Sequence, residues 1–443
     1  MVALSDRKIE IVRTLVESAP DRIVGGLQRA LAETSGDTVL ASVRLLVEAE
    51  ARDRMLRNAV FSPVAPLCVG DGSGAESLVF PARALALVWR GLKSQAPKEM
   101  AAAETAAQAV ASAFAAHQRL PEVSKPFDQV VIVAAEALRT SEARDFRAAA
   151  EVCERARPGG AEAFAACLDI SPVVRRAIPR LPDWVAQPAE EVAAAAHLAF
   201  KDAVEIAEDA GPRFFEMLAA QIDPPWMVLR IISAIMDKPT ERYLHDSELG
   251  GFAERVMDNI DQGLKAIGGL DLDAGPAAGT AAALRVGLIT EQTFELEVAI
   301  ELTRDHGWGK RIFDQKRALA SVVENRLKEA EKLAAAALPT GTSGLTRFRK
   351  AVPRLEEMPD AKAVTRALTA LTFAQAARPF AGHGGFSAAH SKALEKIGAQ
   401  LDHYIEEVLD MARGGEADLA IAHAHLRVAA DAVGLVREEK AGE

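Results

Sequence analysis

The chain has 443 residues, of which 49% are hydrophobic, enough to bury a substantial core and to suggest two or three domains. Its formal net charge of −11 argues against a general nucleic-acid surface, which needs lysines and arginines to displace counterions from phosphates. Aromatic residues make up only 5% while alanine is abundant, so the cores are expected to consist of aliphatic side chains and alanine on closely packed helices.

The cysteines and the apolar segments bear on the cellular compartment. Cys68, Cys153 and Cys167 form no CxxC pair and cannot all be joined in disulfides, which favours a reducing compartment with all three as small buried hydrophobes. Charged residues stand early in the chain, where a signal peptide would be apolar. The longest uncharged alanine-rich segment, 105–118, is shorter than the roughly 18 residues of a spanning helix. We therefore expect a cytoplasmic protein without a transmembrane segment.

The first region, residues 1–98, begins with helical periodicity. Ile9, Val12 and Val16 recur at three- and four-residue steps, as do Val39 and Val43 further on, which predicts two or three helices within residues 5–60.

Residues 67–80 contain a glycine-rich stretch. Gly70, Gly72 and Ala75 fit the loose form of a dinucleotide-binding fingerprint, but the β-prone run that follows ends at Pro81 instead of opening into a helix. The one acidic residue near the distance expected for a ribose ligand is Glu99. A lysine after the glycines, which a phosphate-binding P-loop requires, is missing. We therefore interpret 70–74 as the turn of a small β-hairpin, with Pro81 opening the next helix.

Prolines divide the remainder of the chain unevenly, with sixteen at or before Pro239 and five after it. Because proline interrupts helices, residues 99–267 are expected to form a multi-helix, possibly solenoid-like domain. Four glycines, a proline and two aspartates in 268–279 predict a linker there. Residues 280–443 then carry long helical patterns over 280–304 and 310–337, a loop at 339–344 and two final helices, together typical of an antiparallel bundle.

The last two helices carry the clearest signal in the chain, a seam of apolar residues in steps of three and four. The first row is Leu394, Ile397, Leu401, Tyr404, Val408 and Met411. A second row runs from Leu419 to Val436. Such a period predicts packing along a partner helix, either within one chain or between two chains, and we treat the first row as a candidate interaction seam.

Some polar residues beside glycine-rich turns are candidate ligand contacts: His245, Asp305, His306 and His383. Aspartate and glycine at such turns also serve as helix caps. His403 precedes Glu406 and Glu407 by one helical turn, but the histidines are too dispersed to predict a metal site. We assign no catalytic, cofactor-binding or metal-binding residue.

His390, followed by Lys392, raises a further possibility. The stretch 388–396 bears a thin resemblance to a histidine-phosphotransfer domain, in which an exposed histidine on a helical bundle is phosphorylated. It departs from that family at Ala393 and Leu394, where lysine and glycine usually stand.

The sequence thus predicts an all-α protein with an irregular N-terminal helical domain and a C-terminal bundle of long helices. The favoured function is a non-enzymatic interaction, scaffold or regulatory protein that binds a protein partner or self-associates through helices. The alternatives are an enzyme or small-ligand sensor with a pocket between the two halves, and a phosphorelay-type regulator.

Overall fold

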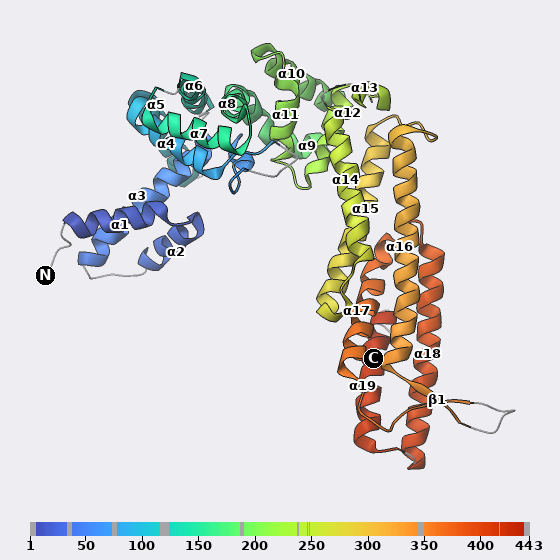
Figure 1. Cartoon of the computed structure of the whole chain (residues 1–443). Coiled ribbons are helices and arrows are strands. Elements are labelled where there is room, and N and C mark those ends of the chain that lie inside the picture. The colour runs from blue at the N-terminus through green and yellow to red at the C-terminus, as the bar shows by residue number, and fades with distance from the viewer. Residues whose placement is uncertain are drawn as a thin grey trace. The chain divides into compact units, whose positions relative to one another are not determined.

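The fold is all-α, as the sequence predicts (Figure 1). The computed structural model describes residues 6–32, 38–72, 78–115, 124–140, 142–186, 190–236, 239–245, 247, 249–343, 350–415 and 417–437. The chain forms two compact units, Met1–Met236 and Asp237–Glu443. This division falls before the predicted linker at 268–279, so the helix at 250–268 belongs with the C-terminal bundle.

The N-terminal unit is a succession of short and medium helices. They are α1 (Asp6–Ser18), α2 (Asp21–Ala32), α3 (Thr38–Val60), η1 (Ala65–Leu67), α4 (Ala82–Gln95), α5 (Pro97–Ala115), α6 (Ser124–Thr140), α7 (Arg144–Ala156), α8 (Gly160–Ala177), η2 (Ile178–Arg180), α9 (Leu181–Ala186), α10 (Glu190–Ile206), α11 (Ala210–Ala219), η3 (Pro225–Met227) and α12 (Val228–Ile235). The expected boundary between residues 98 and 99 falls inside α5. Pro126 and Pro212 lie in the first turns of α6 and α11, where a missing N–H leaves no helical bond unmade.

Two groups of helices make up this unit. Helices α1 and α2 pack on α3, whose small core contains Val16, Val24, Val47 and Ala51. Beyond them α4 packs on α7 and α6 on α8. The second group has the larger core, in which Phe80 and Phe164 lie with their ring centroids 4.8 Å apart.

Arg175 of α8 ties α3 to the second group. Its guanidinium donates to the carbonyl oxygens of Ala59 and Val60 at 2.8 and 2.5 Å, and to the Asp128 carboxylate at 2.9 Å. Burial lowers the pKa of Arg175, against the opposing effect of Asp128. The last carbonyls of α3, which have no partner within the helix, are thereby satisfied by a buried cation.

The predicted hairpin at the glycine-rich stretch takes a different form. Residues 73–77, including Ala75, lie outside the described residues. On either side of them the chain forms a single parallel bridge between Cys68 and Phe80, and Leu67 ends a 3-10 turn. A short 3-10 turn fits the proline at position 66, which cannot donate a strand hydrogen bond. Pro81 is the residue before α4, so the helix begins one residue later than predicted.

The C-terminal unit is built from long helices. Its elements are α13 (Glu241–His245), α14 (Gly250–Gly268), η4 (Leu272–Ala274), α15 (Pro276–Ala299), α16 (Gly307–Ala337), β1 (Thr340–Ser343), β2 (Lys350–Pro353), α17 (Ala361–Ala377), η5 (Arg378–Phe380), α18 (Ser387–Gly414) and α19 (Leu419–Val436). The predicted linker is a short connection, because the Asp271 side chain caps η4 and Pro276 starts α15. The predicted loop at 339–344 is largely strand β1, which pairs antiparallel with β2.

Helix α17 occupies the centre of this bundle, in contact with α15, α16 and α19, while α18 packs on α16 and α19 (Figure 1). At the α15–α17 contact, a Cβ on Gly279 would overlap with the carbonyl oxygen of Thr369. The glycine is therefore what allows these two backbones to approach closely.

The heptad seam is closed within the chain. Leu394, Ile397, Leu401, Tyr404 and Val408 are all buried, and Met411 is half-buried at the end of the row. The seam thus forms the core of the bundle, and its burial leaves it unavailable as a surface for another molecule.

Substitution at the seam tests this packing. Replacing Ile397, which is fully buried, with alanine is expected to lower the free energy of unfolding of the C-terminal unit by about 2–5 kcal/mol through lost burial and a residual cavity. Leu409→Ala on the same helix, at a side chain 37% exposed, is the control and should cost less than about 1 kcal/mol. Urea unfolding followed by circular dichroism measures both, and equal costs would contradict an internal seam.

Arg175→Lys tests the cap on α3. A lysine can keep a charge beside Asp128 but cannot also reach the two carbonyl oxygens, so we expect a loss of about 1.5–3 kcal/mol in the N-terminal unit. Arg176→Lys is a matched control, because this exposed neighbour only approaches Asp202 at 3.9 Å and should cost less than about 1 kcal/mol. Differential scanning calorimetry compares the two variants; similar melting temperatures would show that the cap contributes little.

Candidate functional site

Three of the polar residues singled out from the sequence come together at one end of the C-terminal bundle. The His245 ring lies 5.7 Å from the ring of Trp308, which directly follows the turn containing Asp305 and His306. All three side chains are exposed. His383 is also exposed but lies in the connection before α18. All four candidates therefore lie in the C-terminal unit.

The N-terminus of α16 in this cluster is already capped by the chain itself. The Glu241 carboxylate accepts hydrogen bonds from the backbone N–H groups of Trp308 at 2.5 Å and Gly309 at 3.4 Å. Gly307 has φ of +58°, and a Cβ there would overlap with this carboxylate. His306, the N-cap residue, makes no side-chain cap bond. Glu241 thus takes the place that a bound anion would occupy, which makes the cluster structural.

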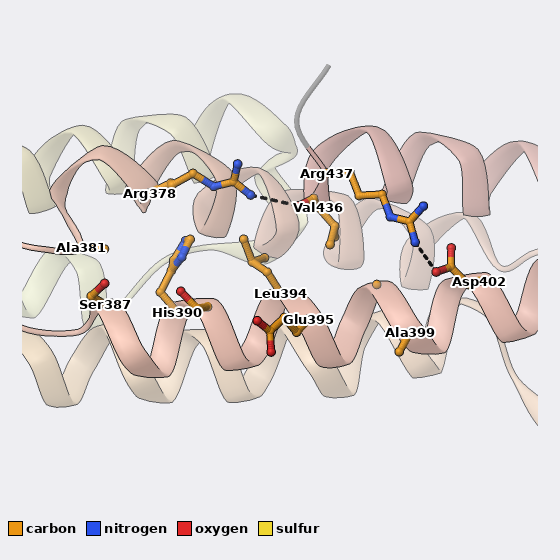
Figure 2. A pocket seen from close by; sticks show the side chains of 12 residues that line it. Arg378, Ala381, Ser387, His390, Leu394, Glu395, Ala399, Asp402, Val436 and Arg437 are labelled. Carbon is orange, nitrogen blue, oxygen red and sulfur yellow. Dashed lines mark hydrogen bonds and ion pairs between the residues drawn. The ribbon is translucent and has the colours of Figure 1, made fainter. Parts of the chain in front are cut away.

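A cavity of about 590 Å³ lies between α18, η5 and the end of α19 (Figure 2). Its polar lining includes Arg378, Ser387, His390, Asp402 and Arg437. Figure 2 shows two of the contacts that hold this lining: Arg378 donates to the Val436 carbonyl oxygen at 3.0 Å, and Arg437 pairs with Asp402. Arg378 thus joins η5 to the end of α19, and Arg437 joins that end to α18.

His390 belongs to the same wall but is only 3% exposed. Its Nε2 lies 2.8 Å from the carbonyl oxygen of Ala374. Because that oxygen can only accept a hydrogen bond, Nε2 carries the proton and donates it. Phosphorylation of a histidine needs an exposed ring nitrogen in reach of a second protein. The geometry of His390 is instead that of a histidine that links α18 to α17.

A second buried histidine, His425, joins three elements. The Tyr404 hydroxyl lies 2.9 Å from His425 Nδ1, and Nε2 lies 3.0 Å from the carbonyl oxygen of Glu357. Because that carbonyl can only accept, Nε2 carries the proton and Nδ1 accepts from the tyrosine. Burial raises the pKa of Tyr404 to about 12, which keeps the hydroxyl protonated as the donor in this chain. The sequence placed Tyr404 in the seam but gave no sign of its partner, 21 residues away.

Beside Tyr404 lies a smaller cleft of about 230 Å³ under the β-strands, with His403 and Glu407 on its wall. These two residues share one side of α18, as their spacing indicates. Within the described ranges, no group of three histidine, cysteine, aspartate or glutamate side chains is placed to hold a metal ion. The cleft therefore shows no assembled metal-ligating set.

The three cysteines lie in the N-terminal unit as free thiols. Cys153 and Cys167 are buried and Cys68 is half-buried. Burial raises the pKa of Cys153 and of Cys167 to about 12 and that of Cys68 further still. Thiols held in the protonated form are poor nucleophiles, so these residues act as small hydrophobes.

The surface feature that sequence reasoning missed is a set of large apolar side chains left exposed on the first three helices: Ile11 (52%), Leu15 (62%), Ile23 (52%), Leu27 (39%), Leu40 (38%), Leu45 (65%) and Met55 (69%). On α1 and α2 they stand four residues apart, so each pair shares one helix face away from the core. We call Ile11, Leu15, Ile23 and Leu27 the N-terminal apolar faces. The signal in the sequence was present, since these helices carry more apolar residues than one core-facing side can bury.

A comparable row lies on α15 in the C-terminal unit, where Leu284, Leu288, Phe294 and Val298 are each between 44% and 58% exposed. Here the exposed row accompanies an extensive buried face on the same helix. Among the described residues of the N-terminal helices, by contrast, seven large apolar side chains are exposed, while the core cluster has four buried hydrophobic residues, with Val12, Ala19, Leu31 and Val43 partly buried against it.

Comparison with protein-family models, with curated proteins and with solved structures finds no match for this chain. Within the described residues, one helix, α19, is long and apolar enough to span a membrane. In the bundle it packs on α17 and α18 and carries the buried His425.

The tyrosine–histidine contact generates a prediction about alkaline stability. The pKa of Tyr404 is higher in the folded protein than its ordinary value near 10, so its contribution to stability is complete below about pH 10 and is lost as pH rises towards 12. In a Tyr243→Phe background Tyr404 is the sole tyrosine, and ultraviolet titration should show its ionisation near 12. Tyr404→Phe should flatten the loss of stability in this range. A midpoint near 10 in the folded protein would contradict the buried contact.

Proposed function

We propose that this chain is a non-enzymatic interaction protein that docks a protein partner through its N-terminal apolar faces. The observation that carries the proposal is the excess of exposed over buried large apolar side chains on α1, α2 and the first part of α3. Large apolar side chains grouped on the surface of a folded protein are costly in water and typically mark a site that another molecule covers. The free, protonated thiols support a reducing, cytoplasmic location for this function.

The alternative of an enzyme or ligand sensor has less support in the geometry. In the cavity of about 590 Å³, Arg378 contacts Val436, Arg437 contacts Asp402 and His390 contacts Ala374. At the α16 N-terminus Glu241 takes the position of an anion. Polar groups engaged in this way hold the helices together, which suits a scaffold for the docking helices.

The proposal is tested by removing the N-terminal apolar faces in the full-length chain. Wild-type protein purified gently from its own host should appear in native mass spectrometry with a second protein chain at fixed stoichiometry. The variant I11S/L15S/I23S/L27S should lose that chain, because burial of these side chains drives the association. Circular dichroism checks that the helical content is kept.

The matched control is L284S/L288S/F294S, which changes the exposed row on α15 by the same chemistry and should keep the partner. Wild type that is a bare monomer would count against the proposal. Loss of the partner in the α15 variant alone would move the docking surface to the other unit.

A further inference from the structure

One side of helix α2 carries both large apolar residues and small ones. Ile23, Gly26, Leu27 and Ala30 stand at positions i, i+3, i+4 and i+7, which places them along one face. Ile23 and Leu27 are 52% and 39% exposed, and Ala30 is also exposed to solvent. The buried Val24 points to a different side, toward the small core with Val16 and Val47. We call these four residues the α2 face.

Gly26 has no steric role within the chain. A Cβ at this position would meet nothing within 4 Å, and the same holds for Gly25. Glycine in a helix interior weakens the helix, and Gly26, unlike Gly25, lies on the side of α2 that carries Ile23 and Leu27. Beside the exposed Ile23 and Leu27, Gly26 provides a gap into which a side chain of a docked helix fits.

The edge of this face is positively charged. Arg22 and Arg29 are both exposed and, being seven residues apart, lie along one edge of the apolar row. The Arg29 Nε donates to the Gly25 carbonyl oxygen, and neither arginine has an ion pair with an acidic residue among those the structure describes. The acidic residues nearest to them in the sequence are Asp21, at the first position of α2, and Glu33, after its end. On α1, Arg7 and Lys8 similarly lie beside the face of Ile11.

From these observations we propose that the α2 face binds an amphipathic helix whose apolar residues are flanked by glutamate or aspartate. This deepens the proposed docking function and rests on it. Charge complementarity selects the partner, because acidic flanks would meet Arg22 and Arg29 across the apolar row. A second copy of α2 would instead set arginine against arginine.

A lipid surface fits less well than a helix. Helices that lie on membranes insert bulky side chains, often aromatic, whereas α1 and α2 contain no aromatic residue and the α2 face has glycine and alanine at alternate contact positions. Small residues are what a helix–helix contact uses to bring two backbones close.

Two designed peptides test the proposal against the full-length chain. Both carry leucine and alanine at i, i+3, i+4 and i+7 over about 21 residues; one has glutamate and the other lysine at the flanking positions. Fluorescence anisotropy at moderate salt should show the glutamate peptide binding at least about tenfold more tightly, which corresponds to about 1.4 kcal/mol. Equal affinities, or no binding of either peptide, would overturn the proposal.

Variants locate the contact. R22E/R29E should reverse the preference between the peptides, and Gly26→Leu should reduce binding of the glutamate peptide at least about tenfold by filling the gap. Gly25→Leu is the matched control: the same change one position away, a rotation of about 100°, also meets open space and should leave binding intact. Equal effects of the two leucine variants would overturn the assigned face.

Two further readouts separate this inference from the broader docking function. If the native partner is lost in I11S/L15S/I23S/L27S but retained in R22E/R29E, docking stands and the acidic-helix inference fails. Association of the chain with itself, or with phosphatidylglycerol vesicles in preference to the glutamate peptide, would likewise overturn the acidic-helix inference.

Discussion

The architecture depends on arginines that satisfy the carbonyl groups at the ends of neighbouring helices. An α-helix leaves its last four carbonyls without intrahelical partners, and a buried end must find donors elsewhere. Five arginines supply them from other elements: Arg54 to the end of α1, Arg175 to α3, Arg230 to α9, Arg326 to α14 and Arg378 to α19. Since the cores are rich in alanine and poor in aromatic residues, apolar packing alone specifies register weakly. A planar, charged donor fixes where one helix meets the next, above all where it reaches several carbonyls at once, as Arg54 and Arg175 do.

Acidic side chains perform the complementary task at helix starts. Glu241 caps α16 from a segment more than sixty residues earlier, and Glu154 accepts from the backbone of Gly159 and Ala161 at the start of α8. Asp360 and Asp418 cap α17 and α19 locally. Anions at helix N-termini and cations at C-termini both complement the helix dipole. Many polar residues beside turns are therefore used in construction, and at the turn before α16 the residue so used is Glu241, not the exposed Asp305 or His306.

Features that depend on residues close together in the sequence could be predicted from it, whereas features that depend on contacts between distant residues could not. The seam from Leu394 to Val408 is a local, periodic signal, and it correctly marks buried positions of α18. The contact of Arg175 with Ala59 spans 116 residues and has no local signature. Likewise the division after Met236 falls in no conspicuous glycine-rich stretch, whereas the glycines and aspartates of 268–279 make a tight connection between packed helices. Periodicity predicts that a face is apolar, but only tertiary contacts decide whether it lies inside.

The N-terminal helices show the consequence of that distinction. Their core contains valines and alanine, and Arg54, which is 7% exposed, pairs with Glu50 and donates to the carbonyls of Val16, Glu17 and Ala19. Charge-assisted bonds of this kind contribute roughly 1.5–3 kcal/mol each. They hold α1 on α3 without burying the larger aliphatic side chains of α1. Ile11, Leu15, Ile23 and Leu27 are thus left for an intermolecular contact on a platform that is already ordered. A surface held in place before binding loses less conformational entropy on association, so the same polar construction that stabilises the fold also makes these faces suited to docking.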